Sequence, residues 1–121
     1  MSEKILMIVD DSKVSRMMLT AQIKQLKPDL QLIEAENAED AVAKLQGKQI
    51  DYFSVDLNMP GKNGLELIAD IKPEHPNAKF ALLTANIQEG THKKSEELGV
   101  CCVNKPITEE SVGQLMDYFY G

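Results

Sequence analysis

The sequence has few of the features that mark membrane, secreted or metal-stapled proteins. Its only cysteines, Cys101 and Cys102, are adjacent. That spacing suits neither an ordinary disulfide nor a four-ligand zinc site, so we expect them to act as small strand residues. The start, MSEKILMIVDD, joins a short apolar run to two acids, unlike a signal peptide or a membrane span. We therefore expect a cytoplasmic protein without membrane insertion.

Positive charge is also scarce. The chain has 13 lysine and arginine residues and 19 acidic residues, which gives a formal net charge of −6. This balance argues against a nucleic-acid partner, because such partners are bound by clustered basic residues, and it favours cation binding. There are no repeats or low-complexity segments, and 43% of the 121 residues are hydrophobic. We expect one globular domain spanning residues 1–121.

Short apolar runs alternate with helix-period patterns along the chain. We expect strands at 4–9, 30–34, 53–56, 79–83 and 100–103, and helices at 12–27, 38–46, 64–72, 87–98 and from 109 to the end. The first strand is almost entirely apolar, as is typical of a parallel strand covered on both faces. The alternation predicts the α/β class, with a mostly parallel five-stranded sheet.

Helix faces and caps follow from the same patterns. The expected inward residues are Leu19, Ile23 and Leu26, then Ala38, Ala41, Val42 and Leu45, and finally Val112, Leu115, Met116 and Phe119. Asn37 and Thr108 are expected N-caps, and Gly47 an expected C′ residue. Met17, Met18, Met59 and Met116 could form an adaptable binding face, but we interpret them as core residues, since methionines at helical spacing more often fill the core. Helix 87–98 has almost no apolar face, so we expect it to be mobile.

Four strands end in residues that carry chemistry. Asp10 and Asp11 follow the first strand, Asp56 ends the third, Thr84 follows the fourth and Lys105 the fifth. Each is weak evidence alone, since acids often cap helices and turns. Parallel strands bring their carboxyl ends to one edge, where ligands of such sheets bind. Because a Pro-Gly turn follows Asp56, we expect that side chain at the rim, reachable from solvent.

Three carboxylates at one edge need a cation. They repel by roughly 1 kcal/mol per pair at 4 Å in water and about 4 kcal/mol at an effective dielectric of 20. Oxygen ligands suit Mg²⁺, whereas no EF-hand spacing favours calcium. With Mg²⁺ bound, Asp56 becomes a candidate nucleophile toward an activated phosphoryl group. Thr84 and Lys105 can contact the phosphoryl oxygens.

With these residues, the sequence resembles the receiver domain of two-component response regulators, especially the stand-alone, CheY-like chemotaxis type. The resemblance covers the whole chain and rests on VDD, VDLNMPGKNG, LLTA and NKPIT, in that order and at matching separations. It implies a flavodoxin-like (βα)5 fold with strand order 2-1-3-4-5. It also implies phosphoryl transfer to Asp56 from a sensor histidine kinase or phosphotransfer protein, and signalling through a downstream effector protein.

The resemblance also implies individual roles. Asp11 and Asp56 would bind Mg²⁺ directly, Asp10 would act mainly through water, and Asn58 would offer its backbone carbonyl. Thr84 and Lys105 would bind the phosphoryl group. The Lys105-Pro106 bond would be cis. Asn58 and Asn86 resemble positions that tune the lifetime of the phosphoryl group, although turn chemistry explains them equally well.

One position departs from the family pattern. Cys102 stands three residues before Lys105, where many receivers have a tyrosine or phenylalanine that turns inward on activation. Signalling would then pass through the Thr84 to Ile87 loop and helix 87–98. Two other functions are open. A non-phosphorylated pseudo-receiver is disfavoured by the intact site residues, and a phosphohydrolase by the lack of a second aspartate two residues after Asp56.

Overall fold

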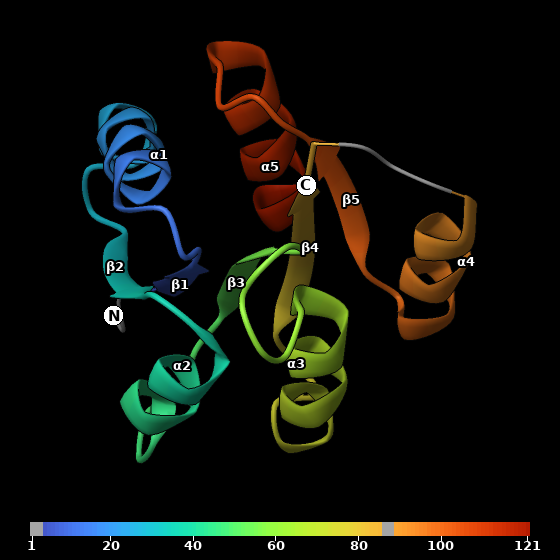
Figure 1. Ribbon diagram of the computed structural model, residues 1–121. Helices are drawn as coiled ribbons and strands as arrows, with labels where there is room; N and C mark the ends of the chain where they lie inside the picture. The colour runs from blue at the N-terminus through green and yellow to red at the C-terminus, as the bar shows by residue number, and fades with distance from the viewer. Residues whose placement is uncertain (1–3, 86–88) are drawn as a thin grey trace.

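The computed structural model describes residues 4–85 and 89–121. Strands alternate with α-helices along the chain, and one 3-10 helix follows α3 (Figure 1). The elements are β1 (Ile5–Val9), α1 (Lys13–Leu26), β2 (Gln31–Ala35), α2 (Ala38–Leu45), β3 (Tyr52–Asp56), α3 (Gly64–Ile71), the 3-10 helix η1 (Lys72–Glu74), β4 (Lys79–Thr84), α4 (Glu89–Leu98), β5 (Cys101–Asn104) and α5 (Glu109–Tyr120). The predicted elements are all present with closely similar bounds. Residues 87 and 88 of the predicted fourth helix lie outside the described residues.

The five strands form one sheet in the order β2-β1-β3-β4-β5, and every neighbouring pair is parallel. The strand order changes direction after β1, so β1 and β3 lie side by side although α1, β2 and α2 separate them in the sequence. The sequence-based prediction of the α/β class and of this strand order is confirmed. Such a reversal of strand order is the usual place for a ligand site in open α/β sheets.

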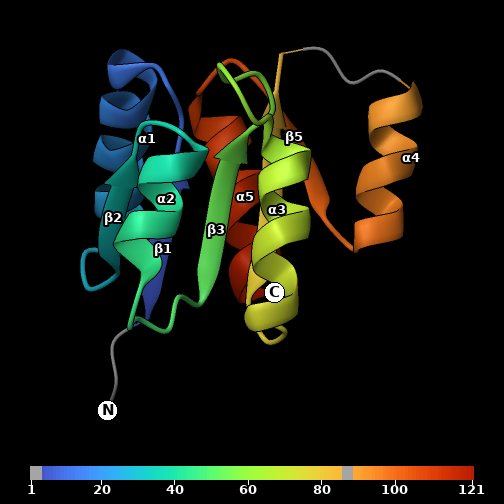
Figure 2. The same cartoon turned by 60° about the horizontal axis from the view of Figure 1, so that its bottom comes forward.

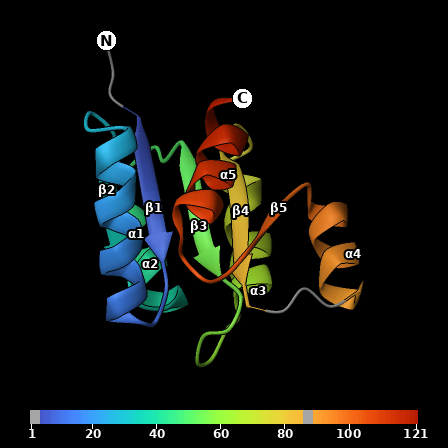
Figure 3. The same cartoon turned by 90° about the horizontal axis from the view of Figure 1, so that it is seen from above.

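The sheet separates two cores, one on each face. Figures 2 and 3 show α2 and α3 on one face and α1 and α5 on the other. Alternate residues of β1 contribute to the two cores: Met7 and Val9 pack with α2 and α3, whereas Leu6 and Ile8 pack with α1 and α5. This explains why the strand has no polar alternation, since both faces are covered.

Side-chain caps start the helices where the sequence indicates. Ser12, Asn37 and Thr108 are extended N-cap residues, and each side chain accepts a hydrogen bond from the amide three residues later. These bonds satisfy amides that have no partner within the helix. Gly47 follows α2 with φ +73°, which fits the predicted C′ role. The Asn37 and Thr108 predictions are therefore confirmed.

Four predicted core residues are instead exposed: Leu26 (52%), Val42 (40%), Met17 (59%) and Met18 (45%). Leu26 has the correct helical spacing, but it is the last residue of α1, where the chain turns towards β2, and only Leu19 and Ile23 of this helix are buried. Val42 lines an open groove between α2 and α3. For these four residues the prediction is wrong.

Among the described residues, no helix combines the length and the apolar character that crossing a bilayer requires.

Candidate functional site

Strand pairing brings the predicted residues to one edge of the sheet. Val9, the residue before the acid pair, lies opposite Val55, and Thr84 lies opposite Asn104. The backbone continues this alignment beyond the strands, because the Lys105 amide donates to the Thr84 carbonyl at 2.9 Å. The ends of β1, β3, β4 and β5 are therefore level, and the side chains that follow them share one site.

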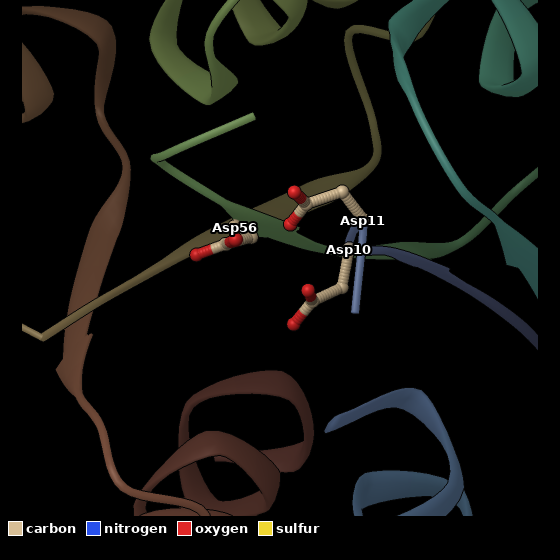
Figure 4. A group of neighbouring side chains, drawn as sticks. All are labelled: Asp10, Asp11 and Asp56. Atoms are coloured by element: carbon tan, nitrogen blue, oxygen red, sulfur yellow. The ribbon is translucent and has the colours of Figure 1, made fainter. Parts of the chain in front are cut away.

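Three carboxylates meet at this edge (Figure 4). One oxygen each from Asp10, Asp11 and Asp56 lies within 4.8 Å of the other two. Asp10 and Asp56 are 2% and 4% exposed, whereas Asp11 is exposed to solvent. The expectation that Asp56 is reachable from solvent is thus wrong for the side chain in this state. Its position at the rim is as expected, but Asp10 and Lys105 pack against it.

Lys105 is the basic group of this site. Its ammonium nitrogen lies 3.2 Å from Asp56 Oδ1 and 3.3 Å from Asp10 Oδ2, and its side chain is 20% exposed. One lysine thus faces two buried carboxylates, with Asp11 beside them. The three acids and one base leave an excess of negative charge, which a divalent cation would neutralise.

The electrostatic environment acts on both partners of the ion pair. Burial raises the pKa of Asp56 above its usual range, and the nearby Asp10 carboxylate raises it further, against the opposing effect of Lys105. Burial by itself would lower the pKa of Lys105, but Asp56 and Asp10 outweigh it and hold that pKa above its usual value. The lysine therefore stays protonated, and it is the ionised form of the Asp56 carboxyl that the site makes less favourable.

Thr84 and Asn58 complete the predicted set. Thr84 ends β4 and is 1% exposed. Asn58 is exposed, two residues beyond the end of β3. The Lys105-Pro106 peptide bond is cis, as predicted. Asn86 and the Ile87 end of the predicted loop lie outside the described residues.

The segment after Asp56 needs glycine at two positions. Gly61, in the predicted Pro-Gly turn, has φ +77°, a conformation that other residues rarely adopt. Gly64 starts α3 directly against the end of β3, where an added Cβ would lie 2.4 Å from the Asp56 carbonyl oxygen and 2.9 Å from Leu82 Cδ1. Any side chain at Gly64 would therefore displace the backbone that carries Asp56.

Cys102 has a polar partner on the neighbouring helix. The Ser95 hydroxyl of α4 and the Cys102 sulfur of β5 lie 3.0 Å apart in a hydrogen bond. Ser95 is 1% exposed, and Cys102 is half-buried. The position expected to hold an aromatic residue thus holds a small side chain that joins β5 to α4.

Sequence reasoning overlooked two residues beside the site. Gly64 is one, and its signal would have been the NG pair directly before a helical pattern. The other is Arg16 of α1, which donates from Nη1 to the Asp10 carbonyl at 2.6 Å. The sequence could have pointed to it, because it is the only arginine in the chain.

Comparison with protein families gives one match along almost the whole chain. The model described as "Response regulator receiver domain" matches residues 6–117. Among curated proteins, the chain is 36% identical over 86 residues to the "Chemotaxis protein CheY" of Listeria monocytogenes, covering 70% of this chain and 71% of that protein. It is 30% identical over 104 residues to the "Sensor protein EvgS" of Escherichia coli K12, covering 85% of this chain and 8% of that protein.

Comparison with solved structures supports the same fold. The chemotaxis protein CheY4 of Vibrio cholerae superposes with a TM-score of 0.87 at 20% sequence identity, covering 98% of this chain and 99% of that one. At this level of identity the likeness concerns the fold alone.

Proposed function

Because the chain belongs to the response regulator receiver family, we propose that residues 1–121 act as one phosphorylatable receiver domain with Asp56 as the phosphoryl acceptor. The donor would be a phosphohistidine on a partner kinase or phosphotransfer protein, and the signal would pass to an effector protein. The names of the CheY relatives favour a chemotaxis pathway. The observation that carries the assignment is the cluster of Asp10, Asp11 and Asp56 with Lys105 at one sheet edge.

The donor set fits Mg²⁺. All three side chains offer hard carboxylate oxygens, and these lie close enough to share one ion. Asp11 and Asp56 would hold it directly, Asp10 through water, and Asn58 would add its backbone carbonyl. The ion would supply charge neutralisation between the acceptor carboxylate and the incoming phosphoryl group.

The transfer itself uses the acceptor and its neighbours. An Asp56 carboxylate oxygen would form a bond to phosphorus while the P–N bond of the donor breaks. The donor imidazole would leave with the electron pair of that bond and take up a proton. The Thr84 hydroxyl would donate a hydrogen bond to a phosphoryl oxygen. The Lys105 ammonium group would move from the Asp56 carboxylate to the new phosphoryl oxygens.

The role is that of a switch rather than an enzyme acting on an external substrate. The chain would catalyse only its own phosphorylation and dephosphorylation. With Cys102 in place of an aromatic residue, the change at Thr84 would reach partners through the segment after it and α4. The hydrogen bond between Ser95 and Cys102 supports α4 as the element that senses movement of β5.

The test of this function is incubation with a small phosphodonor and Mg²⁺, followed by intact mass measurement. We expect one phosphoryl group on the wild-type chain and none on Asp56→Asn. The matched control is Asp29→Asn, which changes an exposed aspartate in the turn between α1 and β2 and should leave uptake unchanged. A wild-type chain that gains no phosphoryl group from any donor would favour the pseudo-receiver.

The metal assignment has a separate test. Mg²⁺ that binds only the folded chain raises the melting temperature by mass action. We expect this rise in the wild-type chain and its loss in Asp11→Asn. An unchanged wild-type melting temperature at millimolar Mg²⁺ would count against the metal site.

A further inference from the structure

Arg16 is a half-buried basic residue next to the acid pair, and the proposed function leaves it without a role. It is the only arginine among 13 basic residues. It lies in the first half of α1, and its side chain is only 13% exposed. Its guanidinium donates from Nη1 to the Asp10 backbone carbonyl at 2.6 Å and from Nε to the Glu34 carboxylate at 3.2 Å. The group therefore joins the end of β1 to β2.

The Asp10 end of this bridge is fixed on three sides. Besides the bond from Arg16 to its carbonyl, the Asp10 amide donates to the Ala35 carbonyl at 3.1 Å. Its carboxylate Oδ1 accepts from the Ser12 amide at 2.9 Å. Asp11 lies between these anchored residues. The direction of both carboxylates thus depends on the conformation of a turn that Arg16 holds.

The Glu34 end is braced as well. The backbone carbonyl of Glu34 accepts from Lys44 Nζ at 2.6 Å, and Lys44 pairs with Asp40 at 3.1 Å. The Asp40 carboxylate in turn accepts from the Glu36 amide at 3.1 Å. Arg16 is therefore held by a network that spans β2 and α2, so its position does not depend on α1 alone.

We propose that Arg16 is a positioning residue for the divalent cation, holding the turn at Asp10 and Asp11 so that both carboxylates face Asp56. This inference rests on the proposed function, since it assumes that the three acids bind a cation. Residues that orient metal ligands through hydrogen bonds typically contribute 10- to 100-fold to metal affinity. Arginine suits the task because its planar fork donates in two fixed directions, which the lysine ammonium does not reproduce.

Charge and positioning predict opposite effects of removing Arg16. A guanidinium close to the acids repels a cation, so deletion of its charge alone would tighten Mg²⁺ binding. If Arg16 positions the turn, its removal weakens Mg²⁺ binding although a positive charge has been lost. The sign of the change in Mg²⁺ affinity therefore distinguishes the two effects.

The experiment is an NMR titration of amide shifts with Mg²⁺ alone. We expect Arg16→Met to bind Mg²⁺ about tenfold more weakly than the wild-type chain, and Arg16→Lys and Glu34→Gln to lie between the two. The matched control is Lys13→Met, which removes an exposed positive charge beside the same turn and should leave Mg²⁺ affinity unchanged or increase it. Equal or tighter Mg²⁺ binding by Arg16→Met would overturn the inference.

A second readout needs no metal. In the metal-free protein, the Ser12 amide should exchange with solvent about tenfold faster in Arg16→Met than in the wild-type chain, because the turn opens more often. Unchanged exchange would overturn the inference. If Arg16→Met does not fold, Arg16→Lys and Glu34→Gln must show the same direction in both readouts. A wild-type chain that binds no Mg²⁺ would refute the proposed metal site, whereas Ser12 exchange still decides whether Arg16 holds the turn.

Discussion

Helices α4 and α5 both contact β5, yet they are attached to the molecule in different ways. Helix α5 buries five residues: Ser111, Val112, Leu115, Met116 and Phe119. In α4, among the side chains that the structure describes (93–98), Ser95 is buried and Leu98 half-buried. Burial of apolar side chains supplies most of the free energy that holds a helix to a sheet. Helix α5 is therefore held firmly against the sheet, whereas the described side chains of α4 contribute little apolar burial.

The hydrogen bonds that attach the two helices to the sheet also differ. Helix α5 begins at a capping box of Thr108 and Ser111, and Lys79 of β4 donates to the Tyr118 and Phe119 carbonyls in its last turn, both at 3.1 Å. Helix α4 is joined to β5 through Ser95, whose hydroxyl bonds to Cys102 and whose carbonyl accepts from the Val100 amide at 2.8 Å. A weakly held helix can change its position at low cost, which is what a signalling element requires.

The largest expected effect on stability comes from a core substitution in α5. Leu115→Ala removes a side chain that is 0% exposed. It should destabilise the fold by about 2–5 kcal/mol, because a cavity remains in the core, and lower the melting temperature by roughly 10 °C or more. The matched variant Leu98→Ala, at the end of α4, should cost only about 1 kcal/mol. Thermal melts of equal size for the two variants would contradict the comparison.

A smaller change in the free energy of unfolding is expected from a substitution at the acidic site. Asp56→Asn should stabilise the metal-free fold by on the order of 1 kcal/mol at neutral pH, because burial and the nearby Asp10 charge disfavour the Asp56 carboxylate more than Lys105 favours it. Exchange of α5 amides, which reports global unfolding, should slow accordingly. Exchange of α4 amides should not, if that helix opens locally.

The pH dependence of this gain follows from the pKa of Asp56, which the fold raises above its usual value of 3.8. The folded wild-type chain then binds a proton more readily than the unfolded chain, so its stability falls as pH rises through the raised pKa. The advantage of Asp56→Asn is full above that pKa and disappears below pH 3.8. Denaturant melts at several pH values would reveal the trend, and a constant advantage would refute it.

A more local effect is expected at the joint between α4 and β5. Ser95→Ala removes the hydrogen bond to the Cys102 sulfur and should cost about 0.5–1.5 kcal/mol. Hydrogen exchange should accelerate in α4 much more than in α5. Acceleration spread evenly over both helices would mean that α4 opens only with the whole fold.

The smallest effect on global stability, and the most direct test of signalling, comes from a phosphoryl mimic bound with Mg²⁺. Exchange in residues 89–98 should change, while exchange in α5 stays nearly constant. The Asp56→Asn chain is the control and should show no difference on addition of the mimic. An α4 segment that does not respond in the wild-type chain would rule out this helix as the output element.

The helices, the strands and the grouping of the strand-end residues could be predicted from the sequence, because they depend on the order of residues along the chain. Periodicity and caps predicted the helices, and the almost entirely apolar run of β1 predicted a strand covered on both faces. Because parallel strands end at one edge, Asp10, Asp56 and Lys105 could be grouped without coordinates. The strand order itself, however, came from the resemblance to a known family, since periodicity says nothing of which strands pair.

The tertiary structure decided whatever depends on where elements end relative to one another. Leu26 has the spacing of a core residue, but as the last residue of α1 it is exposed. Asp56 is buried rather than open because Asp10 and Lys105 meet over it from other strands. The bond from Arg16 to the Asp10 carbonyl depends on how the start of α1 packs beside the end of β1. The sequence by itself thus determined which side chains meet at this edge of the sheet, and only packing decided their burial, their pairing and the contacts that hold them in place.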